Sequence, residues 1–186
     1  MKKSILKADL LGFYEDEIEG VMDLPLPIKE LLTKVNRKVC NFNREIGFIV
    51  IHYVGAVSSA YNNAIYFENV NLERSAHYFV DAKEIYRVVK DNDIAWHCGS
   101  KTGYKHEFCR NNNSIGVEMC CYKKANGELD VSPAVENRTI HLVKALMNFY
   151  KIPIQGVVRH FDVANKLCPA PFITDNNRWV TFKKRL

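Results

Sequence analysis

Short, continuously apolar segments are the strongest pattern in this chain. Residues 48–53 and residues 114–121 are apolar or small at nearly every position, which is typical of sheet strands covered on both faces. Each segment has one position that breaks the pattern, His52 in the first and Glu118 in the second. Residues 156–159 are predicted to form a last, short strand. The chain therefore contains buried strands, and two of them carry an ionisable group.

The remaining elements follow from spacing and from cap and turn residues. The clearest helix begins at Ser132, a favourable N-cap residue, has Pro133 in its first position and ends before Pro153. Its stripe of mostly apolar residues recurs at helical spacing. The weaker predictions are strands at residues 76–80 and 85–89 joined by a turn at 81–83, a helix over residues 28–35, a short helix capped by Ser58, and a terminal helix within residues 172–186.

The order of these elements predicts an α/β fold, with a single mixed β-sheet flanked by helices. A chain of 186 residues suits one domain with a full core, so residues 1–186 are taken as one domain. Residues 1–24 are acidic and lack clear periodicity, and they are interpreted as an N-terminal extension of undefined role. A turn is expected at Pro25-Leu26-Pro27.

Composition and charge narrow the function classes. The chain is 47% hydrophobic and 25% charged, as in ordinary soluble proteins, and it has no apolar stretch long enough for a transmembrane helix. Lys7 and Asp9 interrupt the apolar part of a signal-like start, so we expect synthesis in the cytoplasm without a signal peptide. The net charge of +5 favours an anionic surface such as a bacterial wall, nucleic acid or acidic lipid. Basic and aromatic residues are not interleaved as in single-strand binders.

The six cysteines do not suggest a disulfide framework. Cys120 and Cys121 are adjacent in a predicted strand and therefore point to opposite faces, and a chain with a normal core does not need such cross-links. We expect most cysteines to be reduced and structural, with Cys168 as the exception. A second zinc site is a weaker alternative, because no CxxC pair anchors it. Its candidate ligands are Cys98, His106, Cys109 and Cys121.

Three residues have the chemistry of a catalytic zinc site. His52 lies at the end of an apolar strand, His160 follows the last short strand, and Cys168 comes eight residues later. Two imidazoles and one thiolate are a ligand set that leaves the fourth zinc position free for water, whereas a closed structural site uses four protein ligands. A lone buried histidine is more often a core residue, but strand ends are where α/β sheets present their chemistry.

Glu118 and Lys166 have two interpretations each. A carboxylate inside an apolar strand is costly unless it is paired or belongs to a site. Glu118 is therefore either a buried ion-pair partner or a general acid and base with a raised pKa. Lys166 is either a solvated surface residue or a cation near the zinc that stabilises an oxyanion.

With these residues in view, the chain resembles the zinc-dependent N-acetylmuramoyl-L-alanine amidases of the type 2 amidase and peptidoglycan-recognition-protein superfamily. The resemblance covers roughly residues 45–180 and rests on several motifs in the family's order. These are Val50-Ile51-His52-Tyr53, Ser75-Ala76-His77-Tyr78-Phe79-Val80-Asp81, Ala95-Trp96-His97-Cys98-Gly99, Asn113-Ser114-Ile115-Gly116-Val117-Glu118, Arg159-His160-Phe161-Asp162 and Lys166-Leu167-Cys168-Pro169.

The resemblance implies a mixed sheet flanked by helices, with Zn²⁺ in a surface groove. His52, His160 and Cys168 match the family's zinc ligands. Glu118 matches the acidic residue that acts on the attacking water, although some relatives use a tyrosine there. Lys166 matches the lysine that stabilises the developing oxyanion.

The same resemblance indicates where substrate would bind. A groove for a sugar on one side and a peptide on the other needs aromatic and amide side chains, for which Tyr53, Trp96 and Asn113 are candidates. His77 and His97 match segments near the groove, without a defined role.

The implied function is zinc-dependent hydrolysis of the amide between N-acetylmuramic acid and L-alanine in bacterial peptidoglycan. We expect a phage or prophage endolysin that is made in the host cytoplasm and acts at the cell wall, without nucleic acid as partner and without membrane insertion. The oligomeric state is left open. The alternatives are a cytoplasmic wall-recycling amidase and a module that binds peptidoglycan without cutting it.

Overall fold

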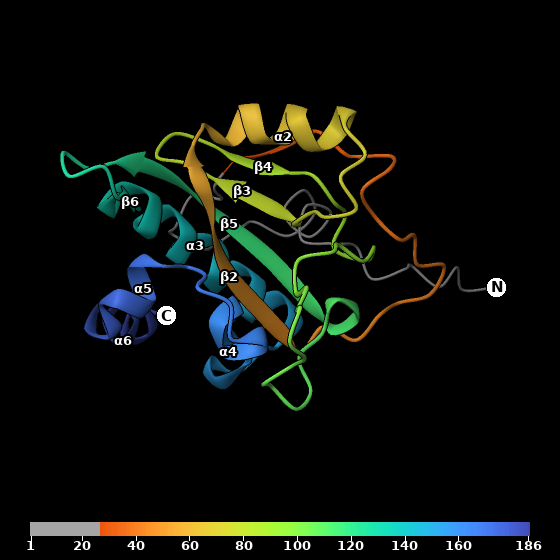
Figure 1. Ribbon diagram of the computed structural model, residues 1–186. Helices are drawn as coiled ribbons and strands as arrows, with labels where there is room; N and C mark the ends of the chain where they lie inside the picture. Colours follow the sequence, from red (N-terminus) through yellow and green to blue (C-terminus); the bar gives the residue numbers. More distant parts are fainter. Residues whose placement is uncertain (1–26) are drawn as a thin grey trace, which may run out of the picture.

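A seven-stranded mixed β-sheet organises the computed structural model, which describes residues 27–186 (Figure 1). Its strands are β1 (Ile28–Glu30), β2 (Phe48–Val57), β3 (Tyr78–Val80), β4 (Ile85–Arg87), β5 (Ser114–Lys123), β6 (Leu129–Asp130) and β7 (Val157–Arg159). The strand order is β1-β4-β3-β5-β2-β7, with β6 paired to β5. The β3–β4 and β5–β6 pairs are antiparallel and the other pairs are parallel, which confirms the predicted mixed sheet.

The central strand β2 lies between β5 and β7 and runs parallel to both. In this register His52 lies opposite Glu118. Ile51 lies opposite Arg159, the residue that precedes His160. Because parallel strands carry their carboxyl ends to the same edge of a sheet, the pairing brings these polar residues together.

Helices cover both faces of the sheet. They are α2 (Ala60–Asn69), α3 (Pro133–Tyr150), α4 (His160–Ala164), α5 (Pro171–Thr174) and α6 (Asn176–Lys184), with short 3-10 turns at Asn111–Asn113 and Ile154–Gly156. Figure 1 shows α2 along one side of the sheet and α3 along the other. Within residues 27–186, no helix has the length and apolar character needed to cross a membrane.

Successive side chains of β5 point to opposite faces of the sheet and pack into two different apolar clusters. Val117 and Cys121 belong to the large apolar cluster that includes the buried stripe of α3, whereas Cys120 belongs to the cluster formed with Ala60 and Ala64 of α2. The adjacent cysteines therefore point to opposite faces, as predicted. All six cysteines are free and buried.

Several element boundaries differ from the prediction. Residues 28–35 do not form a helix, because the backbone of β1 pairs with β4 and the pairing continues when Leu31 N–H donates to the Arg87 carbonyl. The short helix is capped by Ser59 instead of Ser58, since the Ser59 side chain accepts from the Asn62 N–H. The predicted terminal helix is two helices, α5 and α6, separated at Asp175. Residues 1–24, and most of the predicted turn at 25–27, lie outside the described residues.

The long helix α3 has the predicted start and gives a stability test. The Ser132 hydroxyl accepts a hydrogen bond from the Val135 N–H, and the chain leaves the helix at Lys151, which has a positive φ. Ser132→Ala is expected to lower the free energy of unfolding by about 1 kcal/mol, because an N-terminal N–H loses its acceptor. Ser132→Asp keeps an acceptor and should stay near the wild type in urea unfolding followed by circular dichroism. An equal loss in both variants would contradict the capping role.

Candidate metal centre and active site

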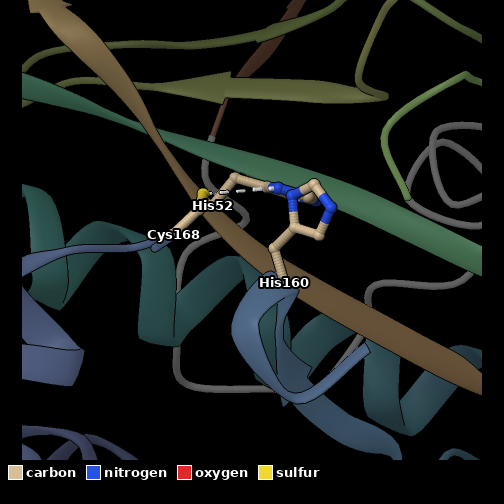
Figure 2. Close-up of side chains that lie close together, drawn as sticks. All are labelled: His52, His160 and Cys168. Atoms are coloured by element: carbon tan, nitrogen blue, oxygen red, sulfur yellow. Dashed lines mark hydrogen bonds between the residues drawn. The ribbon is translucent and has the colours of Figure 1, made fainter. Parts of the chain in front are cut away.

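His52, His160 and Cys168, here called the ligand trio, meet at the carboxyl-terminal edge of the sheet. Their potential ligand atoms all lie within 4.8 Å of one another. The three residues are only 2%, 2% and 5% exposed. Figure 2 shows both imidazoles and the thiol converging from different parts of the chain. In the described part of the chain, this is the one cluster of three or more such groups with metal-site geometry.

The local chain path explains how Cys168 returns to the histidines. His160 is the first residue of α4, directly after β7. The helix ends at Asn165, which adopts a left-handed conformation with φ 53° and reverses the chain. The Cys168 carbonyl then accepts a hydrogen bond from the Phe161 N–H at 2.9 Å, which holds the thiol beside His160.

The hydrogen bonds show which ring nitrogens remain for a metal. His160 Nε2 lies 3.1 Å from the Gly99 carbonyl, which can only accept, so Nε2 carries the proton and Nδ1 keeps its lone pair. His52 Nδ1 lies 3.7 Å from Cys168 Sγ. Tetrahedral zinc, with Zn–S about 2.3 Å and Zn–N about 2.0 Å, would separate sulfur and nitrogen by about 3.5 Å. The trio therefore fits a zinc ion with three protein ligands.

The trio's environment also suits metal binding. Burial lowers the pKa of His52 well below its usual value, with neighbouring cationic groups adding to the effect, and burial lowers the pKa of His160. Both rings are therefore neutral near pH 7, the form that coordinates metals. Burial raises the pKa of the Cys168 thiol, so a cation is needed to stabilise its thiolate form.

Glu118 lies beside the trio without a conventional partner. Burial raises its pKa to about 7, and the nearby Lys166 ammonium offsets part of this rise. Its Oε2 is buried and has no hydrogen-bond partner within residues 27–186, and no Lys or Arg of that range lies within ion-pair distance. Of the two interpretations of Glu118, the buried ion pair is therefore not observed.

A cavity of about 490 Å³ opens over the trio. Glu118, Lys166, Tyr53, Trp96 and His97 line it together with the ligand trio, as the sequence predicted for the site region. Tyr66, Phe67 and Arg74 also line the cavity and were not predicted, because they lie in a helix and a loop whose spacing carries no chemical signal.

Two predicted substrate residues do not reach this cavity. His77 is fully buried, and its Nδ1 accepts from the Gly116 N–H at 2.9 Å. The Asn113 side chain bonds the backbone of Arg110 and Phe108 and holds the turn before β5. Both residues support the scaffold in this structure, and no substrate contact is proposed for them.

The alternative second zinc site is not formed. Cys98 and Cys109 lie in one small apolar cluster with Val50, whereas Cys121 packs in the large cluster on the other face of the sheet. The His106 ring accepts backbone hydrogen bonds through Nδ1 from Phe108 and Cys109. These four residues are therefore divided among separate environments.

Known proteins match most of this chain. A family model described as N-acetylmuramoyl-L-alanine amidase matches residues 42–171. The chain is 37% identical over 147 residues to the N-acetylmuramoyl-L-alanine amidase CwlL of Bacillus licheniformis and 32% identical over 149 residues to BlyA of Bacillus subtilis. Each match covers 74% of this chain but 40% of the relative, so the chain spans about two fifths of the length of these proteins.

Solved structures agree with the sequence matches. PlyL superposes with a TM-score of 0.71 and 27% identity, over 86% of this chain and 96% of PlyL. The catalytic domain of XlyA superposes with a TM-score of 0.69 and 27% identity, over 86% of this chain and 99% of that domain. The fold, the order of motifs and the family match agree, and the chain belongs to the N-acetylmuramoyl-L-alanine amidase family.

Proposed function

We propose that this chain is a zinc-dependent amidase that hydrolyses the bond between N-acetylmuramic acid and L-alanine in bacterial peptidoglycan. The observation that carries the proposal is the ligand trio, open to a cavity on one side, with the unpaired carboxyl of Glu118 beside it. Three protein ligands with a free position are typical of catalytic zinc. When bound, zinc would supply Lewis-acid activation of water and of the amide carbonyl.

Glu118 is suited to move the proton in this reaction. With a pKa of about 7, its carboxyl exists in both protonation states near neutral pH. It can take a proton from the attacking water as the oxygen–carbon bond forms, and give that proton to the leaving amine as the carbon–nitrogen bond breaks. Lys166 lies on the same cavity wall, where its ammonium group would stabilise the negative charge that develops on the carbonyl oxygen.

The surface near the trio suits a long, two-part substrate. Tyr66, Phe67 and Trp96 give the cavity aromatic surface on which a sugar can pack, and Arg74 adds a cation. Tyr53 also lines an adjoining hollow of about 550 Å³, together with polar residues of the β5–β6 turn and α6. The two hollows share Tyr53, so a substrate can extend past the trio in both directions.

A lytic role is favoured over the two alternatives. One of the similar solved structures, at 27% identity and a TM-score of 0.67, is named a mutant endolysin from Bacillus subtilis. The solved structure of AmpD is 18% identical to this chain, so it shows a likeness of fold and carries no argument about the role. A complete ligand trio also argues against a module that only binds peptidoglycan, because binding alone does not need an open metal position. We propose that the chain acts at the bacterial cell wall.

Digestion of purified cell walls tests the reaction. The purified chain is expected to release new L-alanine amino termini from peptidoglycan without new reducing sugar ends, because only the amide is cut. Dinitrophenyl labelling of amino termini and a reducing-sugar assay on the same samples measure both products. New reducing ends without amino termini would show a glycosidase and overturn the proposal.

Cys168→Ser tests the metal. A hydroxyl is a far weaker zinc ligand than a thiolate, so the variant should lose bound zinc and wall hydrolysis together. Zinc is measured by plasma emission spectrometry after dialysis against a weak chelator. Cys40→Ser, a buried cysteine outside the site, is the matched control and should retain both properties. Full zinc content and full activity in Cys168→Ser would contradict the proposed ligand.

Glu118→Gln tests the proton transfer. The amide keeps the shape of the carboxyl but cannot accept a proton, so kcat should fall by about 10²-fold or more while zinc content is unchanged. Glu107→Gln is the control, because Glu107 is exposed and lines neither hollow of the site. A wild-type kcat in Glu118→Gln would remove Glu118 from the mechanism.

A further inference from the structure

His97 connects a member of the ligand trio to the next strand of the sheet. Its Nδ1 lies 3.1 Å from His52 Nε2, and its Nε2 lies 3.2 Å from the Ser114 hydroxyl. The His52 and His97 rings meet edge to face, with centroids 5.2 Å apart. His97 is only 6% exposed, so its ring is held on both sides instead of moving in solvent.

The positions of the protons follow from the end of this chain of hydrogen bonds. The Ser114 hydroxyl donates to the Arg110 carbonyl at 2.6 Å, and a carbonyl can only accept. The hydroxyl proton is thereby committed, so the Ser114 oxygen accepts from the Nε2–H of His97. A neutral imidazole has one N–H, and His97 Nδ1 is therefore an acceptor.

The proton positions also determine which nitrogen of His52 is free to bind a metal. Because His97 Nδ1 accepts, His52 must donate to it from Nε2, and His52 Nδ1 keeps its lone pair. Nδ1 is the His52 nitrogen that faces the Cys168 sulfur. The hydrogen-bonded chain thus presents the His52 nitrogen that a metal in the trio requires.

Gly116 provides the space for this arrangement. A β-carbon on Gly116 would lie 2.6 Å from His97 Cγ and 2.8 Å from His97 Nδ1, far inside van der Waals contact. Both groups are constrained, since Gly116 is part of strand β5, which pairs with β2 and β3, and the His97 ring is buried. Any side chain at position 116 must displace the His97 ring.

We propose that His97 is a positioning residue that, with Ser114 and Gly116, fixes the tautomer and orientation of His52 toward the metal. The inference rests on the zinc site of the proposed function. Groups that hold a metal-bound histidine through its second nitrogen commonly contribute 10–100-fold to metal affinity.

A competing contact exists at the same nitrogen. Cys98 Sγ lies 3.3 Å from His97 Nδ1, and a thiol is a weak donor. If the thiol were the donor that matters, its removal would change zinc affinity as much as the loss of His97. Cys98→Ala therefore serves as the matched control, and it should leave zinc affinity within about threefold of the wild type.

The test measures zinc dissociation constants by competition with a chromophoric chelator. His97→Ala and Gly116→Ala are expected to weaken zinc binding by about 10–100-fold. His97→Asn can place its Oδ1 where Nδ1 was, and it should recover most of the affinity. Wild-type affinity in His97→Ala would overturn the inference alone. A wild-type protein that binds no zinc would overturn the proposed function as well.

A second measurement needs no substitution and so does not depend on the folding of variants. Nitrogen-15 NMR of the histidine rings in the metal-free wild-type protein reports which nitrogen carries the proton. Both His52 and His97 are expected to be protonated at Nε2 and unprotonated at Nδ1. An Nδ1–H on either ring would overturn the proposed direction of the hydrogen-bonded chain.

Discussion

The parallel pairing of β2 with β5 and β7 is the constraint on which the site depends. It sets His52 opposite Glu118 and brings His160 to the same edge, although these residues are far apart in the sequence. A slip of one residue in this register would turn His52 toward the large apolar cluster under α3. The burial of Ile49 and Ile51 in that cluster fixes the register, so the apolar side of β2 determines where His52 lies on the opposite side.

The buried histidines near the ligand trio have fixed hydrogen-bond partners, which offset the cost of burying their ring nitrogens. His77 bonds the Gly116 N–H through Nδ1 and the Asp93 carbonyl through Nε2. His97 uses both nitrogens, and His52 and His160 each use Nε2 for a fixed neighbour. The His52 Nδ1 lies 3.7 Å from the Cys168 sulfur, and the potential ligand atoms of the trio all lie within 4.8 Å of one another. Two imidazoles and a thiol in this arrangement have the chemistry of a three-ligand zinc site.

The sequence predicted the ligand trio and the central strands because each signal is local or chemically distinctive. A strand apolar on both faces must be covered, and two imidazoles with one thiolate are a ligand set for catalytic zinc. The helix predicted over residues 28–35 failed because a few apolar positions at helical spacing weigh less than pairing with β4, which the local sequence does not encode. The sequence also did not indicate that the side chains of Asn113 and His77 bond the backbone instead of lining the cavity. Their role toward substrate stays a prediction.

The segment before Glu118 shows how one strand serves both the core and the site. Along β5, Ile115 and Val117 point into the large apolar cluster, so Ser114, Gly116 and Glu118, which alternate with them, face the other side. On that side Ser114 accepts from His97, Gly116 leaves room for the ring, and Glu118 reaches the cavity. A larger residue at 116 would displace the His97 ring from its place beside His52 and Ser114. An apolar residue at 114 would leave the buried Nε2–H of His97 without an acceptor. The small and polar residues of this strand are therefore explained by the site, and its apolar residues by the core.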